Sequence, residues 1–136
     1  MDGPLRENPQ RRHIPRWIVW CAVILALATA GAGIFIGVIS FLKSSEPFRM
    51  TMMEIRGSEA IEAMIGSGIE PGFLVTGSVS YLGSGGGEAE LRIPVTGSKG
   101  EGVAFSQATR NAGTWRLDSL AFKPGVSEPP IMVIDQ

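Results

Sequence analysis

Hydrophobic residues form one long uninterrupted run near the N-terminus of the chain. The run extends from Trp17 to Leu42, 26 residues without a charged side chain. A bilayer hydrocarbon core of about 30 Å is crossed by about 20 apolar helical residues. In lipid, a single segment can satisfy its backbone hydrogen bonds only as an α-helix. The sequence therefore predicts one transmembrane helix over residues 17–42.

The charges on either side of this run predict its orientation. Residues 1–16 contain four arginines and two acidic residues, whereas Lys43, Glu46 and Arg49 follow the run. Because the positive excess stays on the cytoplasmic side, the N-terminus is predicted to be inside and residues 43–136 outside. Residues 1–16, with three prolines and few apolar side chains, are predicted to be a disordered inner tail.

A cleaved signal peptide is the alternative interpretation of the same run. Ala28-Thr29-Ala30 and Ala30-Gly31-Ala32 both fit the small-residue pattern of a cleavage site. Cleavage there would leave a mature N-terminus that begins with an exposed apolar run. We therefore favour a retained anchor.

The apolar residues that follow the anchor recur with the period of a helix. Ser44–Pro47 combines hydroxyl caps, an acid and a proline, which is typical of a helix start. Phe48, Met52 and Ile55 follow at i, i+4 and i+7 and form one apolar stripe. This pattern, interrupted once by a glycine, predicts one or two short helices within residues 46–66.

From Phe73 onward, apolar and polar residues alternate with the period of a β-strand. The predicted strands cover about residues 73–82, 88–96, 102–110 and 114–122, with a short further strand at 131–134. Short glycine-containing turns join antiparallel neighbours. Residues 43–136 are therefore predicted to form an α+β domain. In it, one or two short helices pack on an antiparallel sheet of four to five strands.

Three details of the sheet are predicted from single residues. Val103 and Phe105 are expected to point inward from their strand. The alternation slips near Asp118 and Ser119, where a bulge is expected. Pro94 cannot donate a hydrogen bond to the sheet, so its strand is expected to be an edge strand or to be bulged there.

Composition and charge exclude several classes of function. Residues 43–136 contain eight basic and eleven acidic residues, a balance that argues against a nucleic-acid partner. The only cysteine, Cys21, lies in the apolar run, and the only histidine, His13, precedes it. The outer domain thus lacks the residues of a disulfide, a zinc site, a haem attachment or histidine-based catalysis.

The remaining candidates for chemistry favour no enzyme. The glycine-rich run Gly83–Gly87 is not followed by the Lys-Ser/Thr pair of a phosphate-binding loop, so it is interpreted as a hairpin tip. Glu88 and Glu90 lie two residues apart on a predicted strand, and acid–base catalysis needs groups that converge in a cleft. We predict no catalytic residues, no cofactor and no metal site.

The first segment after the anchor supplies a candidate partner-contact surface. Phe48, Met52 and Ile55 form an apolar stripe that could contact a partner protein, and strand addition at an edge of the sheet is the other expected mode of binding. Met50, Met52 and Met53 would also suit a soft Cu(I) ion, although methionines at such spacing more often fill gaps in helix packing.

Within the anchor, small residues recur at helical spacing. Gly33 and Gly37 fit the GxxxG pattern that lets two helices approach closely in lipid. The pattern predicts a weak homodimer through the transmembrane helix, although glycine is common in such helices.

Three further stretches, together with the anchor and the helical segment, carry a family resemblance. They are residues 69–78 (IEPGFLVTGS), 89–102 (AELRIPVTGSKGEG) and 113–120 (GTWRLDSL). Over about residues 17–134, the chain resembles the cytochrome c oxidase assembly factor 1 family. The matching motif is a fold signature that contains no catalytic or metal residues, so no such residue is carried over.

The resemblance implies a function in the assembly of a respiratory complex. Eukaryotic members of that family are inner mitochondrial membrane proteins that bind an early intermediate of the core oxidase subunit. Their outer domain resembles that of a small subunit of the mitochondrial presequence translocase. The expected function is therefore that of a chaperone-like, membrane-anchored assembly factor that binds membrane-protein subunits, those of cytochrome c oxidase first among them.

Two other functions and two locations remain open. The alternatives are a general membrane-tethered interaction module in an unrelated complex and, third, a copper-handling protein. The N-terminal tail has three prolines, two acids and no serine, unlike a mitochondrial targeting peptide. This tail favours a bacterial plasma membrane over a mitochondrial inner membrane.

Overall fold

The computed structural model describes residue 3, residues 13–125 and residues 127–135. Most of the predicted disordered tail, residues 1–16, therefore lies outside the described residues. The chain divides into two compact units, residues 1–35 and residues 36–136. The α+β class predicted from the sequence is confirmed, with an N-terminal apolar helix, two short helices and an antiparallel sheet.

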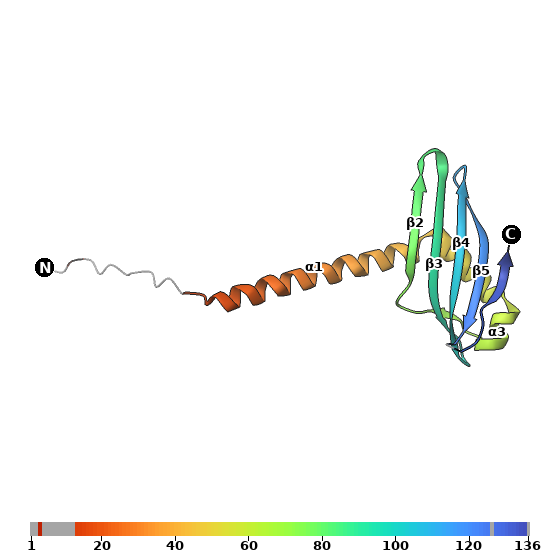
Figure 1. The fold of residues 1–136 in the computed structure, drawn as a ribbon, viewed down its shortest axis with the longest axis horizontal. Helices are drawn as coiled ribbons and strands as arrows, with labels where there is room; N and C mark the ends of the chain where they lie inside the picture. Colours follow the sequence, from red (N-terminus) through yellow and green to blue (C-terminus); the bar gives the residue numbers. More distant parts are fainter. Residues whose placement is uncertain (1–2, 4–12, 126, 136) are drawn as a thin grey trace. The chain divides into compact units, whose positions relative to one another are not determined.

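The first element is the long helix α1 (Arg16–Ser44), which contains the whole apolar run (Figure 1). It is the one helix in the described part of the chain that is long and apolar enough to cross a membrane. Only Ile39 and Leu42 are buried along its length. Side chains such as Leu25 and Ile34 are more than two-thirds exposed. A helix so apolar and so exposed needs a lipid or protein environment.

Two short helices follow in the described residues, and a serine caps the start of each. In α2 (Glu46–Gly57), the Ser45 hydroxyl accepts a hydrogen bond from the Phe48 amide, and a proline occupies the first turn. In α3 (Glu59–Ile65), the Ser58 hydroxyl accepts from the Ile61 amide. These caps satisfy amide groups that have no partner within the helix.

In the part of the chain that the structure describes, six strands form one antiparallel sheet. They are β1 (Glu70–Pro71), β2 (Thr76–Leu82), β3 (Gly86–Thr96), β4 (Glu101–Asn111), β5 (Thr114–Pro124) and β6 (Ile131–Asp135). The order is β1-β3-β4-β5-β6, and β2 also pairs with β3. The two-residue strand β1 is additional to the expected strands, and β2 begins at Thr76 rather than at about residue 73. A short 3-10 turn, Gly83–Gly85, links β2 to β3.

Strand β3 has two short partners on the same side, and Pro94 lies between them. β1 pairs with β3 at Val95 and Thr96, and β2 pairs with it from Arg92 onward. In the gap, the Gly72 amide donates to the Pro94 carbonyl oxygen over 2.7 Å. The expectation of an edge strand or a bulge at Pro94 was wrong, because the missing N–H of this interior strand faces the gap between β1 and β2.

The register of β4 confirms one predicted detail and corrects another. Gln107 pairs with Ser119 and Ala108 with Leu117, so Asp118 is the extra residue of the predicted bulge. Val103 and Phe105 were expected to point inward, but their parity in β4 places both on the face away from the helices, and the Phe105 side chain is 39% exposed. Pairing with β3 and β5 places the small residues Ala104, Ser106 and Ala108 on the helix-covered face and Phe105 on the other face.

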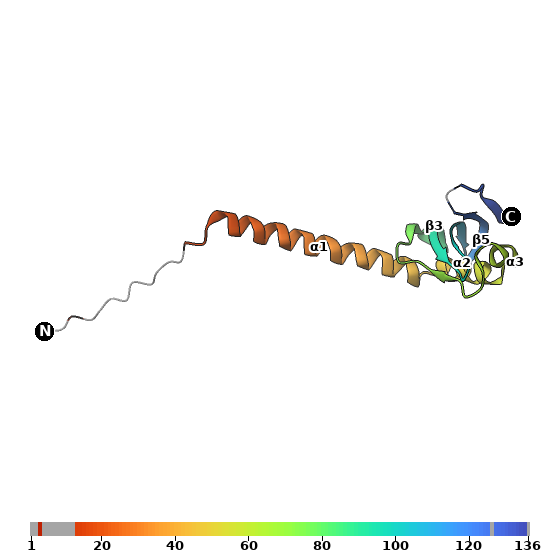
Figure 2. The same ribbon diagram turned by 90° about the horizontal axis from the view of Figure 1, so that it is seen from below.

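Helices α2 and α3 cover one face of the sheet (Figure 2). The core lies between the two layers and consists largely of branched aliphatic side chains and one phenylalanine. Its fully buried members include Ile55, Ile61, Ile65, Leu91, Ile93, Val95, Leu120 and Phe122. Burial of these side chains, at about 1.5–3 kcal/mol each, is the main force that holds the helices on the sheet.

One buried polar contact joins the two layers. The Thr51 hydroxyl, which has no exposed surface, lies 2.8 Å from the Pro47 carbonyl oxygen and 2.9 Å from the Ser106 hydroxyl. Because a hydroxyl has one proton, the consistent order is Ser106 donating to Thr51 and Thr51 donating to Pro47. This chain of hydrogen bonds fixes the rotation of α2 above β4.

We expect Thr51→Val to destabilise the domain by about 1–3 kcal/mol, because Ser106 would keep a buried hydroxyl without its partner. Replacing both residues, as Thr51→Val with Ser106→Ala, should restore part of that loss. Thermal unfolding of the single and double variants measures the coupling. Strictly additive effects would show that the two hydroxyls do not interact.

Candidate protein-interaction surface

The stripe predicted to contact a partner faces the sheet. Phe48, Met52 and Ile55 are 7%, 3% and 0% exposed and belong to the core. They pack inward because the apolar face of the sheet has no other cover. A partner would have to displace α2 to reach them, so the structure gives no support to the predicted contact at this stripe.

The three methionines of α2 do not face one site. Met52 is 3% exposed and lies in the core, whereas Met53 is 73% exposed. Met50 is partly buried and packs against the core from its margin. This spread fits the packing interpretation of the methionines better than a shared Cu(I) ion, which needs thioethers that converge.

The two glycines of the predicted helix-pairing motif lie on the open surface of α1. A Cβ atom placed on Gly33 or Gly37 would meet nothing within 4 Å. The surface there is free for a close approach by a second helix, and the pairing itself stays a prediction.

Strand β2 presents the longest open edge of the sheet (Figure 1). It pairs with β3 on one side along seven residues, and all of these except Val79 are exposed. Its sequence, Thr-Gly-Ser-Val-Ser-Tyr-Leu, contains no charge and no proline. Natural edge strands usually carry charged residues or proline, which prevent pairing with another chain. The unprotected edge of β2 is therefore a ready template for a further strand.

The opposite edge of the sheet is less open to pairing. Strand β6 has five residues, and its register with β5 shifts between Leu120 and Ala121. Two prolines precede it, and it ends in an aspartate. Each of these features hinders strand addition. The edge of β2 is thus the stronger candidate for a binding site.

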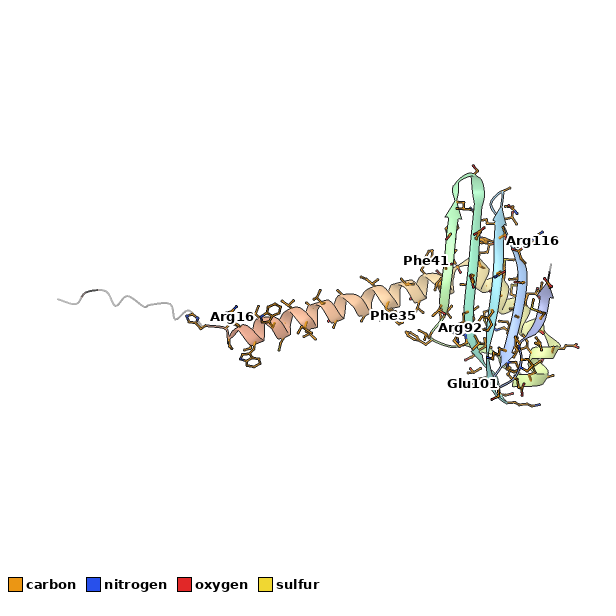
Figure 3. All side chains as sticks on the ribbon, viewed as in Figure 1. Arg16, Phe35, Phe41, Arg92, Glu101 and Arg116 are labelled. Atoms are coloured by element: carbon orange, nitrogen blue, oxygen red, sulfur yellow. The ribbon has the colours of Figure 1, made fainter. Side chains whose placement is uncertain are left out.

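On the face of the sheet away from the helices, an acidic hollow adjoins β2. Its volume is about 330 Å³, and its lining comprises Ser78, Ser80, Glu88, Ala89, Glu90, Gln107, Ala108, Thr109 and Asp118. The Asp118 carboxylate accepts hydrogen bonds from the Thr109 hydroxyl and from the Arg116 guanidinium, which lies 3.1 Å away (Figure 3). Glu88 and Glu90 have no basic partner among the described residues. The hollow is suited to basic or hydrogen-bond-donating side chains of a bound segment.

On the helix-covered face, the tip of β2 carries an aromatic and basic cluster. The rings of Tyr81 and Trp115 meet edge to face, with centroids 5.9 Å apart. The Arg110 guanidinium lies 5.4 Å from the centre of the Tyr81 ring. Tyr81 is 56% exposed and Leu82 58%. Trp115 is 5% exposed and supports the Tyr81 ring from the core, so Tyr81 and Leu82 are the side chains at this tip that a partner bound along β2 would contact.

The residues that carry the family resemblance form a clasp between the sheet and α3. The β3–β4 turn, residues 97–100, donates backbone hydrogen bonds from Lys99 and Gly100 to the Ile65 carbonyl oxygen. Ser98 exchanges two more with Ser67: its amide donates to the Ser67 carbonyl, and its hydroxyl accepts from the Ser67 amide. These bonds satisfy carbonyl groups that the end of a helix leaves unpaired. The motif thus acts in the fold and not in chemistry.

The described residues thus form a small α+β domain with an open sheet edge, preceded by one helix long and apolar enough to cross a membrane. The family follows from the sequence: residues 18–128 match the model of the family described as cytochrome oxidase complex assembly protein 1. This match covers most of the chain, which therefore belongs to that family. No curated protein and no solved structure gave a significant match.

The sequence suggested strand addition at an edge of the sheet but did not identify β2 as that edge. Its alternating pattern is that of any half-buried strand, and strand order cannot be read from alternation alone. One signal was present, since the strand lacks both charge and proline, in contrast with the stretch from Glu88 to Pro94. That difference separates an unprotected edge from an interior strand only after the pairing is known.

Proposed function

We propose that this protein is a non-enzymatic, membrane-anchored assembly factor that holds a subunit of cytochrome oxidase through the open edge of β2. The observation that carries the proposal is the family match over residues 18–128, which includes the apolar run as well as the outer domain. The family implies a role in oxidase assembly, and the edge supplies a way to bind.

The anchor is α1, with the N-terminus inside and residues 43–136 outside. Its uncharged run of 26 residues and the arginine-rich tail before it support this arrangement. The tail composition still favours a bacterial plasma membrane, while the family is associated with the mitochondrial inner membrane. Either compartment places the outer domain beside the oxidase subunits.

Strand addition fits the task of an assembly factor. A subunit that awaits its partners has extended segments with unpaired backbone groups, and the edge of β2 can pair with such a segment along seven residues. Side chains of the bound strand would meet the acidic hollow on one face and Tyr81 on the other. Binding mainly through the backbone is reversible and tolerant of sequence, as release in a later assembly step requires.

The side chains of residues 43–136 support a non-enzymatic role. The outer domain has no histidine and no cysteine. The described residues contain no group of three or more His, Cys, Asp or Glu side chains placed to hold a metal ion. The acidic residues that line the hollow, Glu88, Glu90 and Asp118, lie on β3 and β5 with no histidine or cysteine beside them to complete a catalytic group.

A single charged residue on β2 should test the proposed edge. Ser78 and Gln107 are both exposed and flank the same residue, Glu90, from β2 and from the interior strand β4. Lysine at either position gains the same acidic neighbour, so both variants should fold. We expect Ser78→Lys to reduce copurification of oxidase subunits with the tagged chain roughly ten-fold, because lysine on an edge strand blocks pairing. Gln107→Lys should leave copurification unchanged.

Several outcomes would count against the proposal. Equal copurification by both variants would remove the edge of β2 as the binding site. A deletion strain with normal oxidase content would remove the role in assembly. A set of crosslinked partners without oxidase subunits would instead favour the alternative, a general interaction module on a membrane tether.

A further inference from the structure

The short loop between β1 and β2 displays two adjacent large apolar side chains to solvent. Phe73 is 64% exposed and Leu74 is 51% exposed, although the next residue, Val75, is buried in the core. Single exposed apolar residues are common on proteins. Phe73 and Leu74 are adjacent on one loop and both more than half exposed, so they form a small exposed apolar patch that packing inside the domain does not explain.

The loop is fixed at the end of the apolar helix. The Lys43 ammonium lies 5.7 Å from the centre of the Phe73 ring, a cation–π contact. On the other side, the Gly72 amide is held by the Pro94 carbonyl oxygen at 2.7 Å. A Cβ on Gly72 would approach the Pro94 ring to 3.0 Å. The loop is therefore tied to Lys43 at one point and to the sheet at another.

Lys43 marks the level of the membrane surface. It is the first charged residue after the apolar run, so in a spanning helix its ammonium lies in the headgroup region and its methylene chain lies in the apolar layer below. Phe41, two residues earlier, is 53% exposed and would face lipid. Since Phe73 contacts Lys43 directly, Phe73 must lie at the same level.

We propose that Phe73 and Leu74 insert into the outer interface of the bilayer and hold the outer domain against the lipid surface. Phenylalanine and leucine are favoured on the membrane-facing side of interfacial segments. Lys43, which contacts the Phe73 ring, supplies positive charge for lipid phosphates. The occupant of this surface is the lipid itself, and the inference rests on the proposed anchor.

This contact gives the outer domain a second attachment besides the anchor. A domain attached by one helix alone could rotate about it. The loop that inserts is followed directly by β2, so insertion also fixes how the open edge is presented to a membrane-bound subunit. The loop thereby acts in positioning and does not itself bind the partner.

A fluorescent probe at two matched positions tests the proposal. With Cys21→Ser as background, Leu74→Cys and Met132→Cys each carry one environment-sensitive dye in the full chain. Both native side chains are apolar and similarly exposed, at 51% and 58%. They lie near opposite margins of the sheet, four strand spacings or roughly 19 Å apart. The chains are reconstituted in vesicles of phosphatidylcholine and phosphatidylglycerol, with and without lipids spin-labelled near the headgroup.

We expect the dye at position 74 to shift its emission to the blue and to lose about half of its intensity to the spin-labelled lipid. The dye at position 132 should remain in water and lose little. A dye at position 74 as water-exposed as that at 132 would overturn the proposal. So would a dye that becomes shielded only when oxidase subunits are added, since the loop would then contact protein.

The anchor is tested separately on the same samples. If the chains fail to float with the vesicles, or if alkaline carbonate releases them from the vesicles, both the anchor and the insertion of the loop would be overturned. Chains that float while the loop stays in water would overturn the loop alone and leave the proposed function intact.

Discussion

Gly97→Ala should unfold the α+β domain at a temperature roughly 10 °C or more below that of the native protein. A Cβ on Gly97 would lie 2.3 Å from the Ile65 carbonyl oxygen and 2.9 Å from the Ile65 carbonyl carbon. Both are backbone atoms at the end of α3, and this end is held by the same turn through Lys99 and Gly100. The clasp cannot yield without losing those hydrogen bonds. We expect a loss of about 2–3 kcal/mol, which for a domain of this size corresponds to that shift in melting temperature.

The neighbouring Gly100 supplies the matched control. It lies in the same turn, and a Cβ there would be 4.0 Å from Ile65, an ordinary contact distance. Gly100→Ala should change the melting temperature by only a few degrees. Thermal unfolding of the full chain in detergent is monitored by the β-sheet signal in circular dichroism. Equal melting temperatures for the two variants would mean that the turn does not clasp α3 as described.

The structural roles of residues 93–100 explain why the family motif could be recognised in the sequence, whereas the edge of β2 could not be identified as a binding site. The run Ile-Pro-Val-Thr-Gly-Ser-Lys-Gly, residues 93–100, contributes core side chains, the gap at Pro94 and the turn that holds α3. Each is a local requirement on a particular residue type, so each leaves a trace in the sequence. A site for strand addition has no such requirement, because the backbone does the binding.

Helices and the bulge could be predicted because their causes are local. Ser45 and Ser58 each cap a helix that begins at the next residue, and both show the hydroxyl pattern expected of a helix start. The slip of alternation at Asp118 is visible in the sequence because a bulge changes the parity of the residues around it. Such features do not depend on which strand lies beside which.

The errors arise where the answer depends on strand pairing. Phe105 was assigned inward because it is apolar, but its pairing with Arg92 fixes the face on which it lies. The Arg92 guanidinium lies 5.7 Å from the centre of the Phe105 ring on the exposed face. Pro94 was assigned to an edge or a bulge because its strand was considered without its partners. Shifting the register of a strand by one residue moves each of its side chains to the opposite face of the sheet. Only the three-dimensional pairing decides it.

Phe105 on β4 and Phe122 on β5 provide a test of the register between these two strands. Phe122 is fully buried, with 0% exposure, while Phe105 is 39% exposed on the other face of the sheet. Phe122 pairs with Ala104 and Phe105 with Ala121, so the two residues are one step apart in the same ladder. We expect Phe122→Ala to destabilise the domain by about 3–5 kcal/mol, since it removes a ring from the core and leaves a cavity. Phe105→Ala should lower stability by only about 1 kcal/mol or less.

The cavity left by Phe122→Ala would not close easily. The Phe122 ring lies directly over Gly102, because a Cβ on Gly102 would come within 2.4 Å of its tip. No side chain at that position can therefore swing in to fill the space, which places the expected loss toward the upper part of the range. Chemical unfolding of the full chain, followed through Trp115 after Trp17→Phe and Trp20→Phe, measures both variants. Comparable losses for Phe105→Ala and Phe122→Ala would mean that both rings lie in the core and that the register of β4 is displaced by one residue.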